Sequence, residues 1–161
     1  AVSSGQADFG LCFAKNLPAS IEFTPLADDR YVAACRHDHP LARKTHLSWQ
    51  AYFEQDYIGL DRVSGNRTLL DRELAHLTPA RPSICETRHV TTMLGMVEAG
   101  IGIAAVPAMS MPAGEHSVLR AVPLTDPVVT RTVGLIRLSG RIQSYVAAEL
   151  EKLIIEQYPS G

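Results

Sequence analysis

Short runs of apolar residues recur along the chain and are separated by turns rich in Gly, Pro, Asp and Ser. The runs at residues 9–13, 31–35 and 101–106 are apolar at nearly every position, which is typical of buried strands. Other expected strands are shorter or less apolar. They lie at residues 21–24, 57–60, 83–86, 118–122 and 128–136.

Between these strands the apolar residues take the three- and four-residue spacing of amphipathic helices. A short helix is expected at residues 48–53 and a longer one at 66–77, each beginning near a serine or asparagine cap. A third helix is expected to begin at Val90 and to end where Gly100 supplies a left-handed C-terminal cap. The last helix is expected to open at residues 139–140. Its expected packing face consists of Ile142, Tyr145, Val146, Leu150, Leu153 and Ile154.

This alternation predicts an α/β fold in which a parallel sheet is covered by helices. Ligands of such sheets lie at the carboxyl ends of strands, beside helix N-termini. In the turn at residues 60–67, Ser64, Asn66 and Arg67 can hold a carboxylate through a hydroxyl, amides and a positive charge. The alternative is a simple helix cap followed by a solvent-exposed arginine.

The turn at residues 86–90 offers a second candidate ligand site. Thr87 and His89 precede the third expected helix. Either residue can cap that helix or face a ligand, and the sequence leaves both interpretations open.

Composition sets the class of protein. The 161 residues are 46% apolar and 20% charged, as expected for one soluble domain or two small lobes. A net charge of −2 argues against this piece gripping nucleic acid by itself. Three cysteines without a Cys-x-x-Cys motif are expected to be buried thiols in a reducing cytosol. No apolar run is long enough to span a membrane, and the first residues do not form an intact signal peptide.

The sequence contains no serine nucleophile elbow, phosphate loop or Cys–His signature, so no catalytic residue and no cofactor are expected. His37, Asp38 and His39 have the side-chain types of a zinc site. Because no other ligand cluster lies nearby in sequence, they are expected to belong to a turn, and no metal site is predicted.

Four segments, in order, resemble the effector-binding domain of LysR-type transcriptional regulators. The segment Gly5-Gln6-Ala7-Asp8-Phe9-Gly10-Leu11 is similar to the family's G-x-x-D strand, and Asp38-His39-Pro40-Leu41-Ala42 follows a crossover strand. The most specific match is the string from Met96 to Pro107, similar to V-x-A-G-x-G-I-x-x-x-P. Val122-Pro123-Leu124, a late strand and a closing helix complete the resemblance.

The resemblance implies a fold similar to that of periplasmic binding proteins, with two Rossmann-like lobes and a ligand cleft between them. Residues 37–127 would form the second lobe, and residues 1–36 with 128–161 a first lobe that is truncated at its N-terminus. The winged helix-turn-helix that binds DNA in this family would also be absent. Phe13 and Ala14 would face the cleft from the first lobe, as would Thr132 on the return crossover.

On this interpretation the chain is a cytoplasmic bacterial sensor rather than an enzyme, and its effector is a small carboxylate. The full-length protein would be a homodimer or tetramer that contacts DNA only through the missing domain, with no membrane partner. The main alternative is an exported solute-binding protein of the same fold. An enzyme on a similar scaffold, such as a prephenate dehydratase or a porphobilinogen deaminase, requires catalytic residues that the sequence does not reveal.

Overall fold

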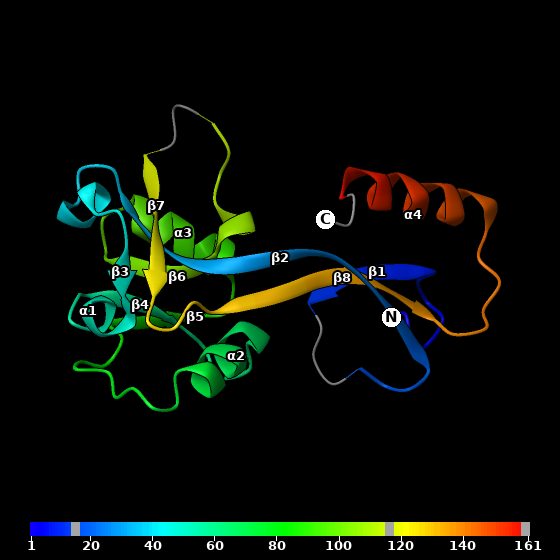
Figure 1. Cartoon of the computed structure of the whole chain (residues 1–161), viewed down its shortest axis with the longest axis horizontal. Coiled ribbons are helices and arrows are strands. Elements are labelled where there is room, and N and C mark those ends of the chain that lie inside the picture. The colour runs from blue at the N-terminus through cyan, green and yellow to red at the C-terminus, as the bar shows by residue number, and fades with distance from the viewer. Residues whose placement is uncertain (14–16, 115–117, 159–161) are drawn as a thin grey trace. The chain divides into compact units, whose positions relative to one another are not determined.

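The computed structural model describes residues 1–13, 17–114 and 118–158. The chain divides into two compact units (Figure 1), and each is described by itself. Unit 1 comprises Ala1–Asp29 and Thr130–Gly161, and unit 2 comprises Arg30–Val129.

Unit 2 is built on a mixed sheet. The second part of strand β2 (Ile21–Arg36) pairs antiparallel with β6 (Ile103–Pro107) and β7 (Leu119–Thr125). Strand β4 (Tyr57–Leu60) is parallel to both β6 and β5 (Cys85–Thr87). The remaining elements of the unit are β3 (Leu47–Ser48), α1 (Trp49–Phe53), α2 (Gly65–Glu73), α3 (Val90–Glu98) and the short 3-10 helices η1 (Pro40–Arg43) and η2 (Ala108–Ser110).

Both faces of this sheet are covered, which explains why its central strands are apolar at every position. Alternate residues of β2, such as Ala33 and Cys35, join a core cluster with the aromatic side chains of α1 and the leucines of α2. The intervening residues Val32 and Ala34 join a second cluster with the buried face of α3. The α/β fold predicted from the alternating pattern is therefore confirmed. The expected parallel sheet is instead mixed, because β2 pairs antiparallel with β6 and β7.

The sequence predicted the start of α1 and the end of α3 correctly. Ser48 caps α1 by accepting a hydrogen bond from the Ala51 N–H at 3.2 Å. Gly100 follows α3 with φ +78°, the left-handed conformation expected of it. Helix α2, however, ends at Glu73 and not at residue 77, because Leu74 turns its side chain into the core at φ −104°.

Unit 1 contains three paired strands and the last helix. Strand β1 (Phe9–Phe13) pairs antiparallel with β8 (Thr130–Leu138), and β8 is also hydrogen-bonded to β2. The strands expected at residues 21–24 and 31–35 are parts of the single strand β2. The charged segment between them hid this continuity, because the partner that allows Asp29 to be buried lies 102 residues away on β8.

The packing face expected for the last helix was wrong. Helix α4 (Tyr145–Gln157) begins after Ser144, whose hydroxyl accepts the Ala147 N–H at 3.2 Å. Ala147 and Glu151 are its buried residues, and Glu151 accepts a hydrogen bond from Gln143 at 2.7 Å. Most of the expected face lies in solvent. Its exposed members are Ile142, Tyr145, Val146, Leu150 and Leu153.

Candidate functional site

The two turns predicted to bind a ligand meet at one edge of the unit 2 sheet. Strands β4 and β5 are parallel with Leu60 opposite Thr87, so their carboxyl ends lie side by side. Beyond the last strand residues, the Asp61 N–H donates to the Thr87 carbonyl at 3.0 Å. Helix α2 follows β4 and helix α3 follows β5, so both helices begin at this edge, on opposite faces of the sheet.

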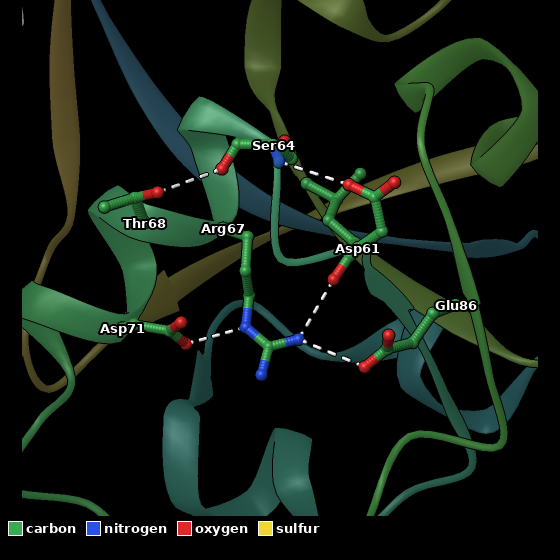
Figure 2. Close-up of polar contacts among 7 residues, drawn as sticks. Asp61, Ser64, Arg67, Thr68, Asp71 and Glu86 are labelled. Carbon is green, nitrogen blue, oxygen red and sulfur yellow. Dashed lines mark hydrogen bonds and ion pairs between the residues drawn. The ribbon is translucent and has the colours of Figure 1, made fainter.

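Ser64 is the N-cap residue of α2, but its side chain makes no capping hydrogen bond. Its backbone N–H donates to Asp61 Oδ1 at 3.1 Å, and its carbonyl accepts from Thr68 Oγ1 at 3.2 Å (Figure 2). The Ser64 hydroxyl forms no hydrogen bond with any described residue. It is therefore available to a ligand at the start of the helix.

Arg67 lies one turn further into α2 and is already paired (Figure 2). Its Nε donates to Asp71 Oδ1 at 2.7 Å, and one terminal nitrogen donates to the Leu60 carbonyl at 2.9 Å and approaches Glu86 Oε1 at 3.3 Å. Hydrogen bonding to Asp71 is the largest cause of a raised pKa of the Arg67 guanidinium. Two carboxylates, those of Asp71 and Glu86, thus hold the Arg67 guanidinium beside the turn. Arg67 is only partly exposed, unlike the solvent-exposed arginine of the alternative interpretation.

Asn66, in the first turn of α2, is held by a hydrogen bond from a strand of the sheet. Its Oδ1 accepts a hydrogen bond from the Tyr31 hydroxyl at 2.8 Å. Tyr31 is buried on β2, so the first turn of α2 is anchored to the centre of unit 2. This contact spans 35 residues of sequence, which is why the sequence alone did not reveal it.

The start of α3 repeats the arrangement found at α2. His89 is the N-cap residue and is exposed, and its side chain makes no capping hydrogen bond. Thr87, the last residue of β5, is half-buried. Arg88 reaches across to the first turn, where its Nε lies 3.3 Å from Asp61 Oδ2. The two helices at this edge therefore lack side-chain caps, whereas Ser48 and Ser144 cap α1 and α4.

The charges around this edge nearly cancel. Arg67 and Arg88 face three carboxylates, which belong to Asp61, Asp71 and Glu86. An anion at this position would be held mainly by helix N–H groups and the Ser64 hydroxyl. The arginines would contribute only when the anion replaces one of their carboxylate partners. The sequence does not reveal these acidic partners, because they come from three separate segments of the chain.

The candidates in unit 1 lie at the end of β1 and on β8. The ring of Phe13 lies 5.3 Å from the guanidinium carbon of Arg131. The Thr132 hydroxyl donates to Asp28 Oδ1 at 2.7 Å. Ala14 lies outside the described residues.

A buried ion pair lies beside these candidates and was not predicted. Asp29 Oδ2 accepts hydrogen bonds from Nε and Nη2 of Arg131 at 3.1 and 2.8 Å, and the Asp29 side chain is fully buried. Asp29 is preceded in the chain by a second acid, Asp28, whose carboxylate accepts the Thr132 hydroxyl. The sequence carries no signal for which of them is buried.

The residues His37, Asp38 and His39 each have a structural partner. His37 Nδ1 lies 3.1 Å from the Val118 carbonyl, and His39 Nδ1 accepts the Leu41 N–H at the start of η1. Asp38 pairs with Arg36, which lowers the pKa of the carboxyl. Within the described part of the chain, no group of three or more His, Cys, Asp or Glu residues is arranged to hold a metal ion.

Comparison with solved structures defines the class of protein. The fold matches the effector-binding domain of QuiR, described in complex with shikimate, with a TM-score of 0.79 at 22% identity over 98% of this chain and 74% of that one. It matches the Synechocystis CcmR regulatory domain, described in complex with 2-PG, with a TM-score of 0.82 at 17% identity over 99% and 77% of the two chains. The fold is therefore that of two-lobed, periplasmic-binding-protein-like effector-binding domains.

Sequence comparison then shows the family. Residues 1–159 match the LysR substrate binding domain, so the chain belongs to this family. It is 40% identical over 154 residues to YbhD, an uncharacterized HTH-type transcriptional regulator of Escherichia coli K12, covering 96% of this chain and 49% of YbhD. It is 30% identical over 156 residues to the regulator YfeR of Shigella flexneri, covering 97% and 50%. The chain thus spans about half the length of these curated relatives.

Among the described residues, no helix is long and apolar enough to cross a membrane.

Proposed function

We propose that this domain senses a small anionic metabolite, which binds where α2 and α3 begin at the shared edge of β4 and β5. The observation that carries the proposal is that two helices without side-chain caps begin at one edge of the sheet, where the Ser64 hydroxyl has no hydrogen-bond partner among the described residues. The N–H groups at a helix start favour an anion electrostatically and by hydrogen bonding.

Each residue at this edge would have a separate role in binding the anion. Ser64 would donate its hydroxyl, while the amide of Asn66 is held in place by Tyr31. Arg67 would strengthen binding by exchanging Asp71 or Glu86 for the ligand, an exchange between partners that are already half-exposed. Thr87 and His89 would complete the site from the second turn.

The remaining parts of the proposal rest on the family. In this view the two units are the two lobes, and Phe13, Ala14 and Thr132 would contribute to effector binding from unit 1. Binding would favour one lobe arrangement and so shift the DNA-bound state of the full-length regulator. That regulator would be a cytoplasmic homodimer or tetramer, with DNA contacted by another domain. Its effector domain would carry out no catalysis.

An exported solute-binding protein of the same fold is the alternative. No observation favours it over a regulator, and the relatives that match most of the chain are described as transcriptional regulators.

The proposal is tested by titrating the protein with a panel of mono- and dicarboxylates, using the matching primary amides as uncharged controls. Amide signals of Gly65, Asn66 and Val90 should shift with a carboxylate and not with its amide. Ser64→Ala should weaken binding by about five- to tenfold. The matched variant Ser110→Ala, in the same unit, should bind as the wild type does.

Stability measurements separate a binding role from a structural role. A serine that caps a helix contributes about 1 kcal/mol, so Ser48→Ala should destabilise the protein by roughly that amount. Ser64→Ala should change stability by less than about 0.5 kcal/mol, because its hydroxyl caps nothing. If no carboxylate shifts these amides, or if Ser64→Ala is as destabilising as Ser48→Ala, the proposed site is wrong.

A further inference from the structure

A separate cavity lies inside unit 2, between α1, α2 and strand β4. Its volume is about 210 Å³. Four aromatic residues line one part of it, namely Trp49, Tyr52, Phe53 and Tyr57. Leu70 of α2 lines another part, together with Leu74 and Leu77, which follow the helix. An apolar cavity of about 150 Å³ is already large enough to admit benzene. The space in unit 2 therefore fits a substituted single ring.

The aromatic wall is continuous. The Tyr52 ring centroid lies 5.6 Å from that of Trp49 and 5.2 Å from that of Tyr57. Phe53 lies 5.5 Å from Tyr57, with the two planes at 65°. The lining rings thus present both edges and faces to the cavity. A planar ligand ring can pack against them in the tilted geometries that aromatic pairs prefer.

One polar group at this wall has an unused donor. The Tyr52 hydroxyl accepts the Ala105 N–H at 2.9 Å, and both residues line the cavity. Its own proton has no acceptor among the described residues, whereas the Tyr57 hydroxyl donates to the Arg81 carbonyl at 3.1 Å. Burial raises the pKa of Tyr52, so its O–H stays protonated. A ligand with one acceptor oxygen would satisfy this donor.

The charges lining the cavity indicate an uncharged ligand. Arg67 is the lining cation, and it is matched by Asp71, which also lines the cavity, and by Glu86. A charged ligand of either sign would lose its hydration against mostly apolar walls when it enters the cavity. This cost does not apply to a neutral ring.

We propose that this cavity is a second ligand site of unit 2, specific for a neutral single-ring aromatic compound that carries one hydrogen-bond acceptor such as a carbonyl. It shares Arg67 with the anion site at the helix starts, but its walls are formed mainly by the four aromatic residues and by Leu70, Leu74 and Leu77. The proposal does not depend on that site.

Trp49 gives a direct measurement because it is the only tryptophan in the chain. Its indole N–H, which donates to the Pro127 carbonyl at 2.9 Å, produces a single indole signal in a nitrogen–proton correlation spectrum. The ligands are acetophenone and ethylbenzene, which have nearly the same shape but differ in the carbonyl. We expect a saturable shift of this signal with both compounds and about fivefold tighter binding of acetophenone.

Three variants of the chain locate the binding. Ala75→Met adds bulk at a lining position and should weaken both ligands at least fivefold, whereas Ala80→Met, an exposed neighbour outside the lining, should not. Tyr52→Phe should remove the preference for acetophenone and leave ethylbenzene within twofold. The proposal is overturned if acetophenone causes no saturable shift of the Trp49 signal, or if Ala75→Met and Ala80→Met bind alike. Because Gly65 and Asn66 report on the anion site, failure of one site is distinguishable from failure of the other.

Discussion

Replacing Asp29 with alanine is expected to destabilise the protein by about 3 kcal/mol, towards the lower end of the range for breaking a buried ion pair. The Asp29 side chain is fully buried, and its Oδ2 accepts two hydrogen bonds from Arg131. Removing the carboxylate leaves a guanidinium that is only 15% exposed without this partner. The ring of Phe13, 5.3 Å away, and the remaining solvent contact offset part of that cost.

The double variant distinguishes an ion pair from simple packing. Arg131→Met should cost at least as much as Asp29→Ala, because it leaves a carboxylate buried without its cation. Asp29→Ala combined with Arg131→Met should cost less than the sum of these two single changes, since no buried charge is left over. The pair therefore predicts strong positive coupling in a double-mutant cycle.

Urea unfolding followed by circular dichroism measures each free energy, with the slope checked for constancy among variants. Asp8→Ala is the matched control in the same unit. Asp8 lies 3.7 Å from Arg141 in a partly exposed pair, so its loss should cost no more than about 1 kcal/mol. A loss below about 1 kcal/mol for Asp29→Ala, or additive effects in the double variant, would refute the reasoning.

Three further predictions concern single positions. Burial raises the pKa of Cys35 to about 11, so iodoacetamide at pH 8 should label the other two thiols and leave Cys35 intact until the protein unfolds, as read by mass spectrometry. Gly95→Ala should stabilise the protein by up to about 1 kcal/mol, because a Cβ in this helix meets nothing within 4 Å. Gly102→Ala should instead destabilise it by about 2 kcal/mol or more, since its Cβ would lie 2.5 Å from a backbone carbonyl oxygen. Thermal unfolding measures both, and equal effects would contradict the prediction. Hydrogen bonds from Arg137 lower the pKa of Glu22 in the folded state, so this carboxylate stabilises the fold at neutral pH and loses its contribution as the pH falls below the ordinary glutamate value of about 4.3. The difference in melting temperature between wild type and Glu22→Gln should therefore shrink between pH 6 and pH 3, and a constant difference would contradict the assignment.

Much of unit 2 was predictable because its signals are local. The run at 31–35 and the one that begins at 101 belong to strands covered on both faces, so nearly every position had to be apolar. The motif around Gly100 and Gly102 also has a local cause. The first glycine takes a positive φ after α3, and the second lets the chain approach the Asp56 carbonyl.

The candidate site was predictable only in part. Ser64, Asn66, Arg67, Thr87 and His89 were selected because they follow expected strands and precede expected helices. Which of their groups remain available depended on partners elsewhere in the chain. Tyr31 holds Asn66, and Glu86 takes part of the Arg67 charge.

The sequence by itself determined the order of strands and helices, the N-terminal cap of α1, the glycine that follows α3, and the family. These follow from the spacing of apolar residues and from short motifs, in which each residue acts on neighbours within one turn or one strand. Only the tertiary structure decided that Asp29 is buried, that β2 is one continuous strand and that the expected face of α4 remains in solvent. A buried charge is tolerated and an apolar face is covered only where a distant segment provides the partner, and such pairing is not encoded in any local pattern.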